Sequence, residues 1–203
     1  MSGPRLVEGW WSAAARRPSP HWNARPPGAA IELALIHSIS LPAGVYGGDA
    51  IERLFAGTLD PAAHPSFEPL RGLEVSAHVL LRRDGSLLQF VPLHERAWHA
   101  GRSVWRGRPN VNDVSVGIEL EGLEGLAFEP AQYAALAGLL RGLARALPLR
   151  EVVGHQHVAP VRKGDPGPGF DWLLLQGLLG PSLPCLPAIW PAGELPPAGP
   201  PKA

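Results

Sequence analysis

The sequence predicts an α/β (α+β) protein, a single domain in which a central mixed β-sheet is flanked by α-helices. Short apolar runs typical of buried strands alternate along the chain with segments whose apolar residues recur at helical spacing. The chain has 203 residues, which suffices for one domain with a complete core and is few for two. Its hydrophobic fraction of 45% is that of an ordinary globular protein.

The N-terminal segment is rich in proline, arginine, serine and tryptophan and shows no periodicity. We therefore expect residues 1–30 to form an irregular arm. Its tryptophans, Trp10, Trp11 and Trp22, are expected to pack this arm on the domain. Residues 31–37, IELALIH, form a short apolar run that predicts a buried strand with a histidine at its end.

A loop rich in glycine and proline follows, up to Gly48. Asp49 then begins a short helix, with Glu52 three residues further on as in a capping box, and Gly57 ends it. Residues 57–72 contain three prolines and predict a long loop, of the kind that often acts as a functional lid.

Two β segments come next. Residues 75–91 predict a hairpin, because two apolar runs flank an Asp-Gly pair at 84–85 that suits a tight turn with positive φ. Residues 115–121, SVGIELE, predict a strand in which Glu119 and Glu121 share one face, while the apolar side chains share the other.

The last third of the folded region predicts two helices and a strand. Pro130 suits the first turn of a helix that continues through leucines at helical spacing. Residues 151–154 predict a short strand that leads into His155. A final helix follows, capped by Asp171 and ended by Gly180.

These elements divide the chain into the arm, a domain at residues 31–180 and a proline-rich tail at residues 181–203, which we expect to be disordered. Cys185 is the only cysteine and lies in this tail. The chain therefore offers no intrachain disulfide and no zinc-thiolate site.

Charge and hydropathy exclude two classes of partner. Lys and Arg total 18 and Asp and Glu total 18, so the basic excess of a nucleic-acid-binding protein is absent. No apolar stretch approaches the length that spans a membrane, and the first residues lack the apolar core of a signal peptide. We expect a cytoplasmic protein that binds neither nucleic acid nor membrane, and the sequence indicates no protein partner.

Some of the eight histidines stand out by position. His37 and His155 each lie where an apolar strand gives way to a polar loop, and functional side chains concentrate at such positions. The segment 154–172, GHQHVAPVRKGDPGPGFDW, adds Lys163 and Asp165 within a backbone shaped by glycine and proline. A carboxylate and an imidazole ten residues apart can converge across a turn.

These residue types suit a catalytic zinc ion, which needs three nitrogen or oxygen ligands and one open position. A carboxylate outside the ligand set would move a proton, and a cation would stabilise the developing oxyanion. Glu119 and Lys163 are the candidates for these roles. Glu121, on the same strand face, is the alternative to Glu119, and a plain surface charge is the alternative interpretation of Lys163.

The sequence resembles the N-acetylmuramoyl-L-alanine amidase type 2 family, and within it the AmpD-type 1,6-anhydro-N-acetylmuramoyl-L-alanine amidases. Six segments in order carry this resemblance and reach over nearly all of the predicted domain. They are SPHWNARP (19–26), LIHSISLPAGVYGG (35–48), SAHVLLRRDG (76–85), ERAWHAG (95–101), NDVSVGIELEG (112–122) and GHQHVAPVRKGDPGPGFDW (154–172).

The resemblance implies the amidase type 2 fold and one zinc ion per chain, bound by His37, His155 and Asp165. It also implies Glu119 as the proton acceptor and Lys163 as the group that stabilises the transition state. The implied reaction hydrolyses the amide bond between the lactyl group of anhydro-muramic acid and L-alanine. This reaction releases the stem peptide during cell-wall (peptidoglycan) recycling, so an anhydromuropeptide is the expected partner.

Four residues in the matching segments, Ser38, Trp98, His99 and Ala100, are expected to contact this substrate. Alternatives remain for two of them. His99, like His78, would equally suit a buried, hydrogen-bonded role, and Trp98 would equally suit core packing.

The sequence also departs from the family. His157 stands where the family usually has aspartate, so it could alter the orientation of a ligand or compete for the metal. Glu74 and Asn110 stand where AmpD-type enzymes commonly carry arginine, and Ser38 replaces a common asparagine. If those arginines bind carboxylates of the stem peptide, this protein should bind that peptide differently.

Two other functions fit parts of the sequence. One is the same chemistry on intact peptidoglycan, as in an autolysin or endolysin, which the missing signal peptide and the absence of wall-binding repeats disfavour. The other is a peptidoglycan-binding module without catalysis, which is disfavoured because all three ligand positions are filled.

Overall fold

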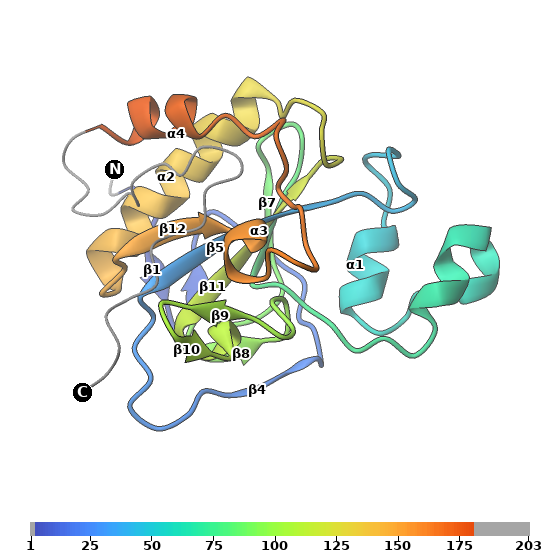
Figure 1. Cartoon of the computed structure of the whole chain (residues 1–203), viewed down its shortest axis with the longest axis horizontal. Helices are drawn as coiled ribbons and strands as arrows, with labels where there is room; N and C mark the ends of the chain where they lie inside the picture. The colour runs from blue at the N-terminus through green and yellow to red at the C-terminus, as the bar shows by residue number, and fades with distance from the viewer. Residues whose placement is uncertain (1–2, 181–203) are drawn as a thin grey trace.

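The computed structural model describes residues 3–180, so the predicted tail and Cys185 lie outside the described residues. The described chain is built around one six-stranded sheet (Figure 1). Its strands lie in the order β12 (Glu151–Gly154), β5 (Leu33–Ile39), β11 (Ser115–Glu121), β6 (Val79–Leu81), β7 (Leu87–Gln89) and β3 (Ala15–Arg16).

The sheet is mixed, as predicted. Strands β12, β5, β11 and β6 run parallel, whereas β7 is antiparallel to β6, and β3 is parallel to β7. The β6–β7 hairpin turns through Gly85 at a φ of 85°. Glu119 pairs with His37 and Gly154 pairs with Ile36, so the carboxyl ends of β5, β11 and β12 meet at one edge of the sheet.

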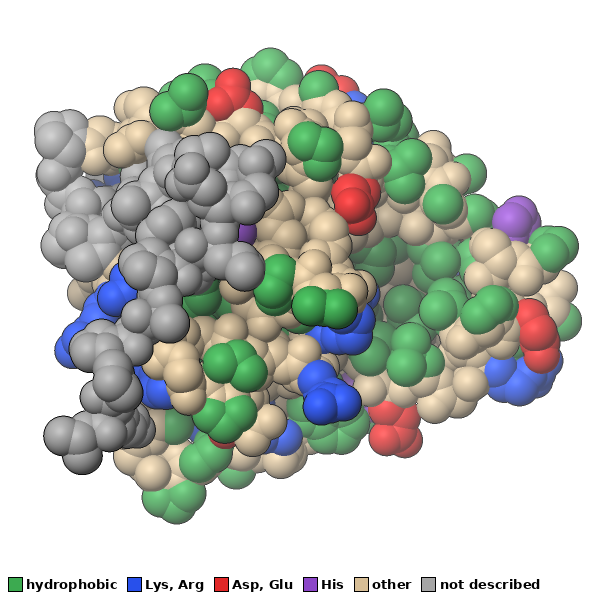
Figure 2. All heavy atoms as spheres, viewed as in Figure 1, with side chains coloured by type: hydrophobic (Ala, Val, Ile, Leu, Met, Phe, Trp, Pro, Cys, Tyr) green, Lys and Arg blue, Asp and Glu red, His purple; other side chains and the backbone are tan. Residues whose placement is uncertain are grey.

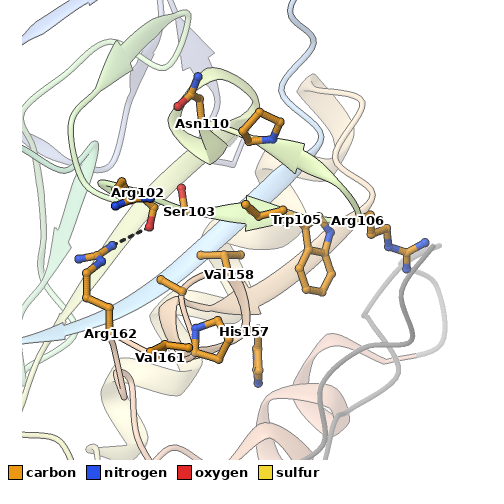
Figure 3. A pocket seen from close by; sticks show the side chains of 13 residues that line it. Arg102, Ser103, Trp105, Arg106, Asn110, His157, Val158, Val161 and Arg162 are labelled. Carbon is orange, nitrogen blue, oxygen red and sulfur yellow. Dashed lines mark hydrogen bonds between the residues drawn. The ribbon is translucent and has the colours of Figure 1, made fainter. Parts of the chain in front are cut away.

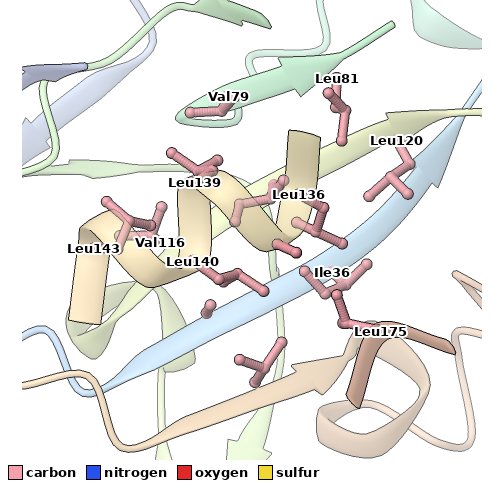
Figure 4. Packing of buried hydrophobic residues seen from close by; sticks show 14 of the residues in the cluster. Ile36, Val79, Leu81, Val116, Leu120, Leu136, Leu139, Leu140, Leu143 and Leu175 are labelled. Carbon is pink, nitrogen blue, oxygen red and sulfur yellow. The ribbon is translucent and has the colours of Figure 1, made fainter. Parts of the chain in front are cut away.

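Two helices, α2 (Pro130–Ala146) and α4 (Trp172–Leu179), lie over one face of the sheet (Figure 1). Figure 4 shows the leucine stripe of α2 packed against side chains of β5, β6 and β11. Each fully buried leucine of this kind contributes roughly 1.5–3 kcal/mol relative to an exposed one. Asp171 caps α4 as predicted, because its Oδ1 accepts a hydrogen bond from the Leu174 N–H at 2.8 Å. Within residues 3–180, no helix is long and apolar enough to cross a membrane.

Shorter elements cover the opposite face. They are α1 (Ala50–Phe55), β9 (Val104–Trp105), β10 (Arg108–Pro109), η3 (Val111–Val114) and α3 (His155–Val158). α1 packs on the β6–β7 hairpin, with Phe55 edge-on to Phe90 at 5.0 Å between ring centroids. Leu33 and Leu35 of β5 pack with Trp105 in a separate cluster. Both faces of β5 are therefore buried, which holds the site at its end firmly in place.

The arm is more regular than the sequence indicates. Residues 1–30 contain β1 (Leu6–Val7), β2 (Trp10–Trp11), β3 and β4 (Trp22–Ala24), and β4 pairs with β8 (Glu95–Ala97). The arm satisfies the edges of β7 and β8 with strands of two or three residues, which are too short to leave a periodic pattern. Trp11 is buried against α2, whereas Trp22 is exposed.

The predicted capping box at the start of α1 is wrong. The Asp49 side chain makes no cap hydrogen bond, because it pairs with Arg53 one turn further on, at 2.7 Å between Oδ2 and Nε.

The loop predicted over residues 57–72 contains two 3₁₀ helices, η1 (Pro61–Ala63) and η2 (Pro65–Leu70). Each begins with a proline, and the residue before that proline, Asp60 or His64, caps the turn with its side chain. The prolines thus open short helices here, where the sequence analysis predicts irregular chain.

Candidate metal centre and active site

Two imidazoles and one carboxylate converge at the carboxyl edge of the sheet. His37 lies on β5, His155 begins α3 directly after β12, and Asp165 lies in the loop after α3. His37 Nδ1 is 3.0 Å from His155 Nδ1 and 3.1 Å from Asp165 Oδ2, and His155 Nδ1 is 3.2 Å from the same oxygen. All three side chains are buried. The strands and the glycine- and proline-rich loop therefore bring together the three predicted ligands.

The surroundings of His155 fix which ring nitrogen carries its proton. Nε2 lies 3.0 Å from the carbonyl oxygen of Ala100, which only accepts, so Nε2 donates. In the neutral ring, Nδ1 is then the nitrogen that has the lone pair. Burial lowers the pKa of His37 to about 4, so this imidazole is neutral at pH 7. Burial alone would raise the pKa of Asp165, but its contacts with His155 and His37 lower that pKa below its usual range. The neutral imidazole of His37, the ring of His155 and a carboxylate thus face one another, and a cation between them would stabilise this arrangement.

The spacing suits a small tetrahedral cation. Zinc–ligand bonds of roughly 2.0–2.1 Å at tetrahedral angles imply ligand separations of about 3.3–3.4 Å, slightly above those of this triangle. Two imidazole nitrogens and one carboxylate oxygen are also a donor set of catalytic zinc sites. Among residues 3–180, no other three His, Cys, Asp or Glu side chains gather this closely.

Glu119 lies beside this cluster because β11 pairs in register with β5. Its side chain is buried, and Oε2 has no hydrogen-bond partner among the described residues. Burial, and then the charge of Asp165, raise the pKa of Glu119 well above its usual range, while the charge of Lys163 opposes them. Glu121, the alternative, is instead held by Arg82, so the geometry favours Glu119 for proton transfer.

A cleft of about 400 Å³ opens next to the cluster, and Asp165, Lys163 and Ser38 line it. Lys163 is exposed, and its charge lowers the pKa of both Glu119 and His37. Figure 2 shows this face of the molecule hollowed between the segment that carries α1 and η2 and the rest of the surface. The site is therefore open to a ligand and has a cation on its wall.

The sequence profile of the N-acetylmuramoyl-L-alanine amidase family matches residues 27–168. The chain belongs to this family. It is therefore an amidase, a hydrolase that cleaves amide bonds, as the resemblance of its six segments predicts.

Individual relatives cover almost the whole described chain. The 1,6-anhydro-N-acetylmuramyl-L-alanine amidase AmpD of Citrobacter freundii is 49% identical over 179 residues, 87% of this chain and 96% of that protein. The crystal structure of a selenomethionine derivative of AmpD matches with a TM-score of 0.82 and 48% identity, over 86% of this chain and 98% of that one. The structure of the Escherichia coli amidase AmiD in complex with anhydro-N-acetylmuramic acid-L-Ala-D-γ-Glu-L-Lys matches with a TM-score of 0.52 and 30% identity. The match covers 88% of this chain and 66% of that one. The predicted fold is confirmed.

The four residues expected to contact the substrate of this amidase have different surroundings. Ser38 lines the cleft. His99 and Ala100 stand behind the cluster, with His99 Nδ1 3.0 Å from His37 Nε2 and the Ala100 carbonyl facing the other histidine. Trp98 is half-buried, and its indole N–H donates to a side chain of the arm. The structure thus gives His99 and Ala100 contacts with the cluster rather than with the cleft.

The departures from the amidase family lie outside the cluster. His157 Nδ1 accepts a hydrogen bond from the Gly154 N–H at 2.9 Å, and its ring packs against Trp172. It therefore holds the start of α3, and its Nδ1 points away from the three predicted ligands. Glu74 and Asn110 are both exposed.

A second cavity, of about 760 Å³, lies between the β9–β10 hairpin and α3, and Asn110 and His157 are on its wall (Figure 3). Arg162 lines both this cavity and the cleft, and it donates to the Ala100 carbonyl at 2.7 Å. That oxygen is also the acceptor for His155. Sequence reasoning missed this link because a backbone carbonyl leaves no pattern of residue types.

Proposed function

We propose that this chain is a zinc-dependent amidase that hydrolyses the lactyl–L-alanine bond of 1,6-anhydro-N-acetylmuramoyl peptides, in peptidoglycan recycling in the cytoplasm. The observation that carries the proposal is the triangle of His37 Nδ1, His155 Nδ1 and Asp165 Oδ2 beside Glu119, whose Oε2 has no hydrogen-bond partner within residues 3–180. The names of the relatives and the anhydromuropeptide bound to AmiD support the choice of substrate.

In this mechanism His37, His155 and Asp165 hold the ion, and the cleft admits the substrate. A zinc ion there would supply a Lewis acid that polarises the amide carbonyl and acidifies water. Glu119 accepts the proton of the attacking water and returns it to the nitrogen of L-alanine as the C–N bond breaks. Its raised pKa suits a group that must hold that proton briefly. Lys163 stabilises the negative charge on the carbonyl oxygen.

The test combines metal analysis with product analysis. Purified chain should contain about one zinc ion, and mass spectrometry should show free peptide released from anhydro-muramoyl tripeptide. Asp165→Ala should abolish both, whereas Asp49→Ala, an exposed carboxylate paired with Arg53, should change neither. Release from tripeptide at full rate by chelated, zinc-free protein would overturn the metal mechanism. Release from purified sacculi but not from tripeptide would overturn the proposed substrate.

A further inference from the structure

Both ring nitrogens of His37 have defined neighbours, and the one that faces away from the cluster is Nε2. His37 Nε2 lies 3.0 Å from His99 Nδ1, with the two rings edge-on at 86°. His99 Nε2 lies 3.3 Å from Ser115 Oγ, and that hydroxyl lies 2.7 Å from the carbonyl oxygen of Val111. A series of three side-chain contacts therefore connects His37 to the backbone carbonyl of Val111.

The last contact of this series sets the direction of each hydrogen bond in it. The Val111 carbonyl only accepts, so the Ser115 hydroxyl donates to it and accepts from His99 Nε2–H. A neutral imidazole with its proton on Nε2 has a lone pair on Nδ1, so His99 Nδ1 accepts from His37 Nε2–H. His37 Nδ1 is then left with a lone pair, which faces His155 and Asp165.

We propose that His99 is a positioning residue that holds His37 in the tautomer and ring orientation required for metal binding through Nδ1. This inference rests on the metal-binding part of the proposed function. His99 and Ala100 then act as a pair, since the side chain of one orients His37 and the carbonyl of the next orients His155. One short segment thus aligns both imidazoles.

The strand next to His99 leaves room for this arrangement. A Cβ atom at Gly117 would lie 2.4 Å from the His99 ring, which is too close for any side chain. The φ of Gly117 is not in the left-handed region, so space alone requires glycine there. His78 cannot replace His99 as the acceptor, because its Nδ1 already accepts from the Gly117 N–H at 3.0 Å.

The experiment compares zinc affinity among variants of His99. His99→Leu keeps most of the volume and removes the acceptor, whereas His99→Asn keeps an acceptor near the position of Nδ1. Zinc dissociation constants from competition with a chelator should rise about 10- to 100-fold for the leucine variant and much less for the asparagine variant. The visible spectrum of the Co²⁺-loaded leucine variant should also change, while the metal-free proteins unfold at similar temperatures.

Gly117→Ala provides a second, independent variant, with Gly138→Ala in α2 as the matched control because its Cβ would meet no atom within 4 Å. The first should weaken zinc binding and the second should not. Wild-type affinity in a folded His99→Leu protein would overturn the proposal. If the variants fail to fold, ¹⁵N spectra of the wild-type rings decide, since a proton on His37 Nδ1 in the metal-free protein would contradict it. Zinc binding that follows this pattern without tripeptide hydrolysis would refute only the proposed substrate.

Discussion

Two buried carboxylates on the same face of β11 have opposite surroundings. Glu121 accepts hydrogen bonds from Arg82 at 2.7 Å and from the Gly47 N–H at 2.8 Å, and Arg82 also pairs with Glu52. Glu119, two residues before, has an oxygen without a hydrogen-bond partner in the described chain. The last residue of the strand thus forms a satisfied ion pair, and the residue two positions before it is an unsatisfied acid beside the three predicted ligands.

The difference shows that burial of a charge does not by itself mark a reactive site. A paired carboxylate such as Glu121 ties the loop at Gly47 to the sheet and serves the fold. An unpaired one costs free energy in the folded state, because it loses water and gains no partner. Such a cost is expected where a group must stay free to exchange a proton. The two glutamates should therefore respond in opposite ways to substitution.

Glu119→Gln should have the largest effect of the substitutions considered, and this effect should be confined to the rate of hydrolysis. Loss of the proton acceptor should lower kcat on anhydro-muramoyl tripeptide by about 10²- to 10⁴-fold. The zinc content should stay near one per chain, and the free energy of unfolding should not fall, because the amide replaces an unpaired acid. Turnover, elemental analysis and denaturant unfolding on the same preparation check this. A variant within tenfold of the wild-type rate would exclude Glu119 as the acceptor.

Glu121→Ala should show the reverse pattern. It removes one of the two carboxylates that pair with the Arg82 guanidinium, whose side chain is only 11% exposed, and leaves Glu52 as the other. Removal of one partner from a buried pair typically costs about 3–5 kcal/mol of unfolding free energy. Zinc affinity should be unchanged. At temperatures where the variant is fully folded, its loss of kcat should be smaller than the loss in Glu119→Gln. Replacing Arg82 as well should recover part of the lost stability, and a lack of coupling between the two would argue against the ion pair.

Lys163→Ala should lower kcat by about 10²- to 10³-fold, through loss of charge stabilisation on the oxyanion. Because Lys163 is exposed, the unfolding free energy should change by only about 0.5 kcal/mol. Arg102→Ala, an exposed cation on the wall of the second cavity, is the matched control. Equal losses of rate in the two variants would indicate a general effect of charge and not a role specific to Lys163.

The sequence predicted the elements that have a clear period. The strand around Glu119, the Asp-Gly hairpin and the leucine-rich helix from Pro130 are confirmed, because alternation and helical spacing reflect burial directly. The strands of the arm were missed because two or three residues carry no period. Pairing of β3 and β4 depends on free edges elsewhere in the fold, which local composition does not reveal.

The sequence predicts which residues form the candidate site, but it does not predict the contacts between them. Positions at strand ends indicated His37 and His155, and the family resemblance added their role as ligands. The alternation of β11 put Glu119 and Glu121 on one face and could not separate them, since the distinction comes from Arg82 on the β6–β7 hairpin. The contact of His99 with His37 likewise depends on the pairing of distant segments.

The smallest predicted effect is on the pH dependence of stability, through buried histidines outside the predicted ligand set. Burial lowers the pKa of His157 to about 4, and burial with the charge of Arg25 lowers the pKa of His78 to about 3. In the unfolded chain a histidine has a pKa near about 6.5. As pH falls below that value, the unfolded state takes up these protons first, so stability is complete above about pH 6.5 and declines toward pH 4.

Each such histidine contributes a slope of at most about 1.4 kcal/mol per pH unit. His157→Asn removes one titrating group, and its amide oxygen is able to accept the Gly154 N–H in its place. Denaturant unfolding between pH 7.5 and 4.5 should therefore give a shallower decline for this variant, with similar stability at pH 7.5. His94→Asn, at an exposed position, is the control. An unchanged slope in His157→Asn would mean that His157 has the same pKa in the folded and the unfolded chain, and would contradict the hydrogen bond that its unprotonated Nδ1 accepts from Gly154.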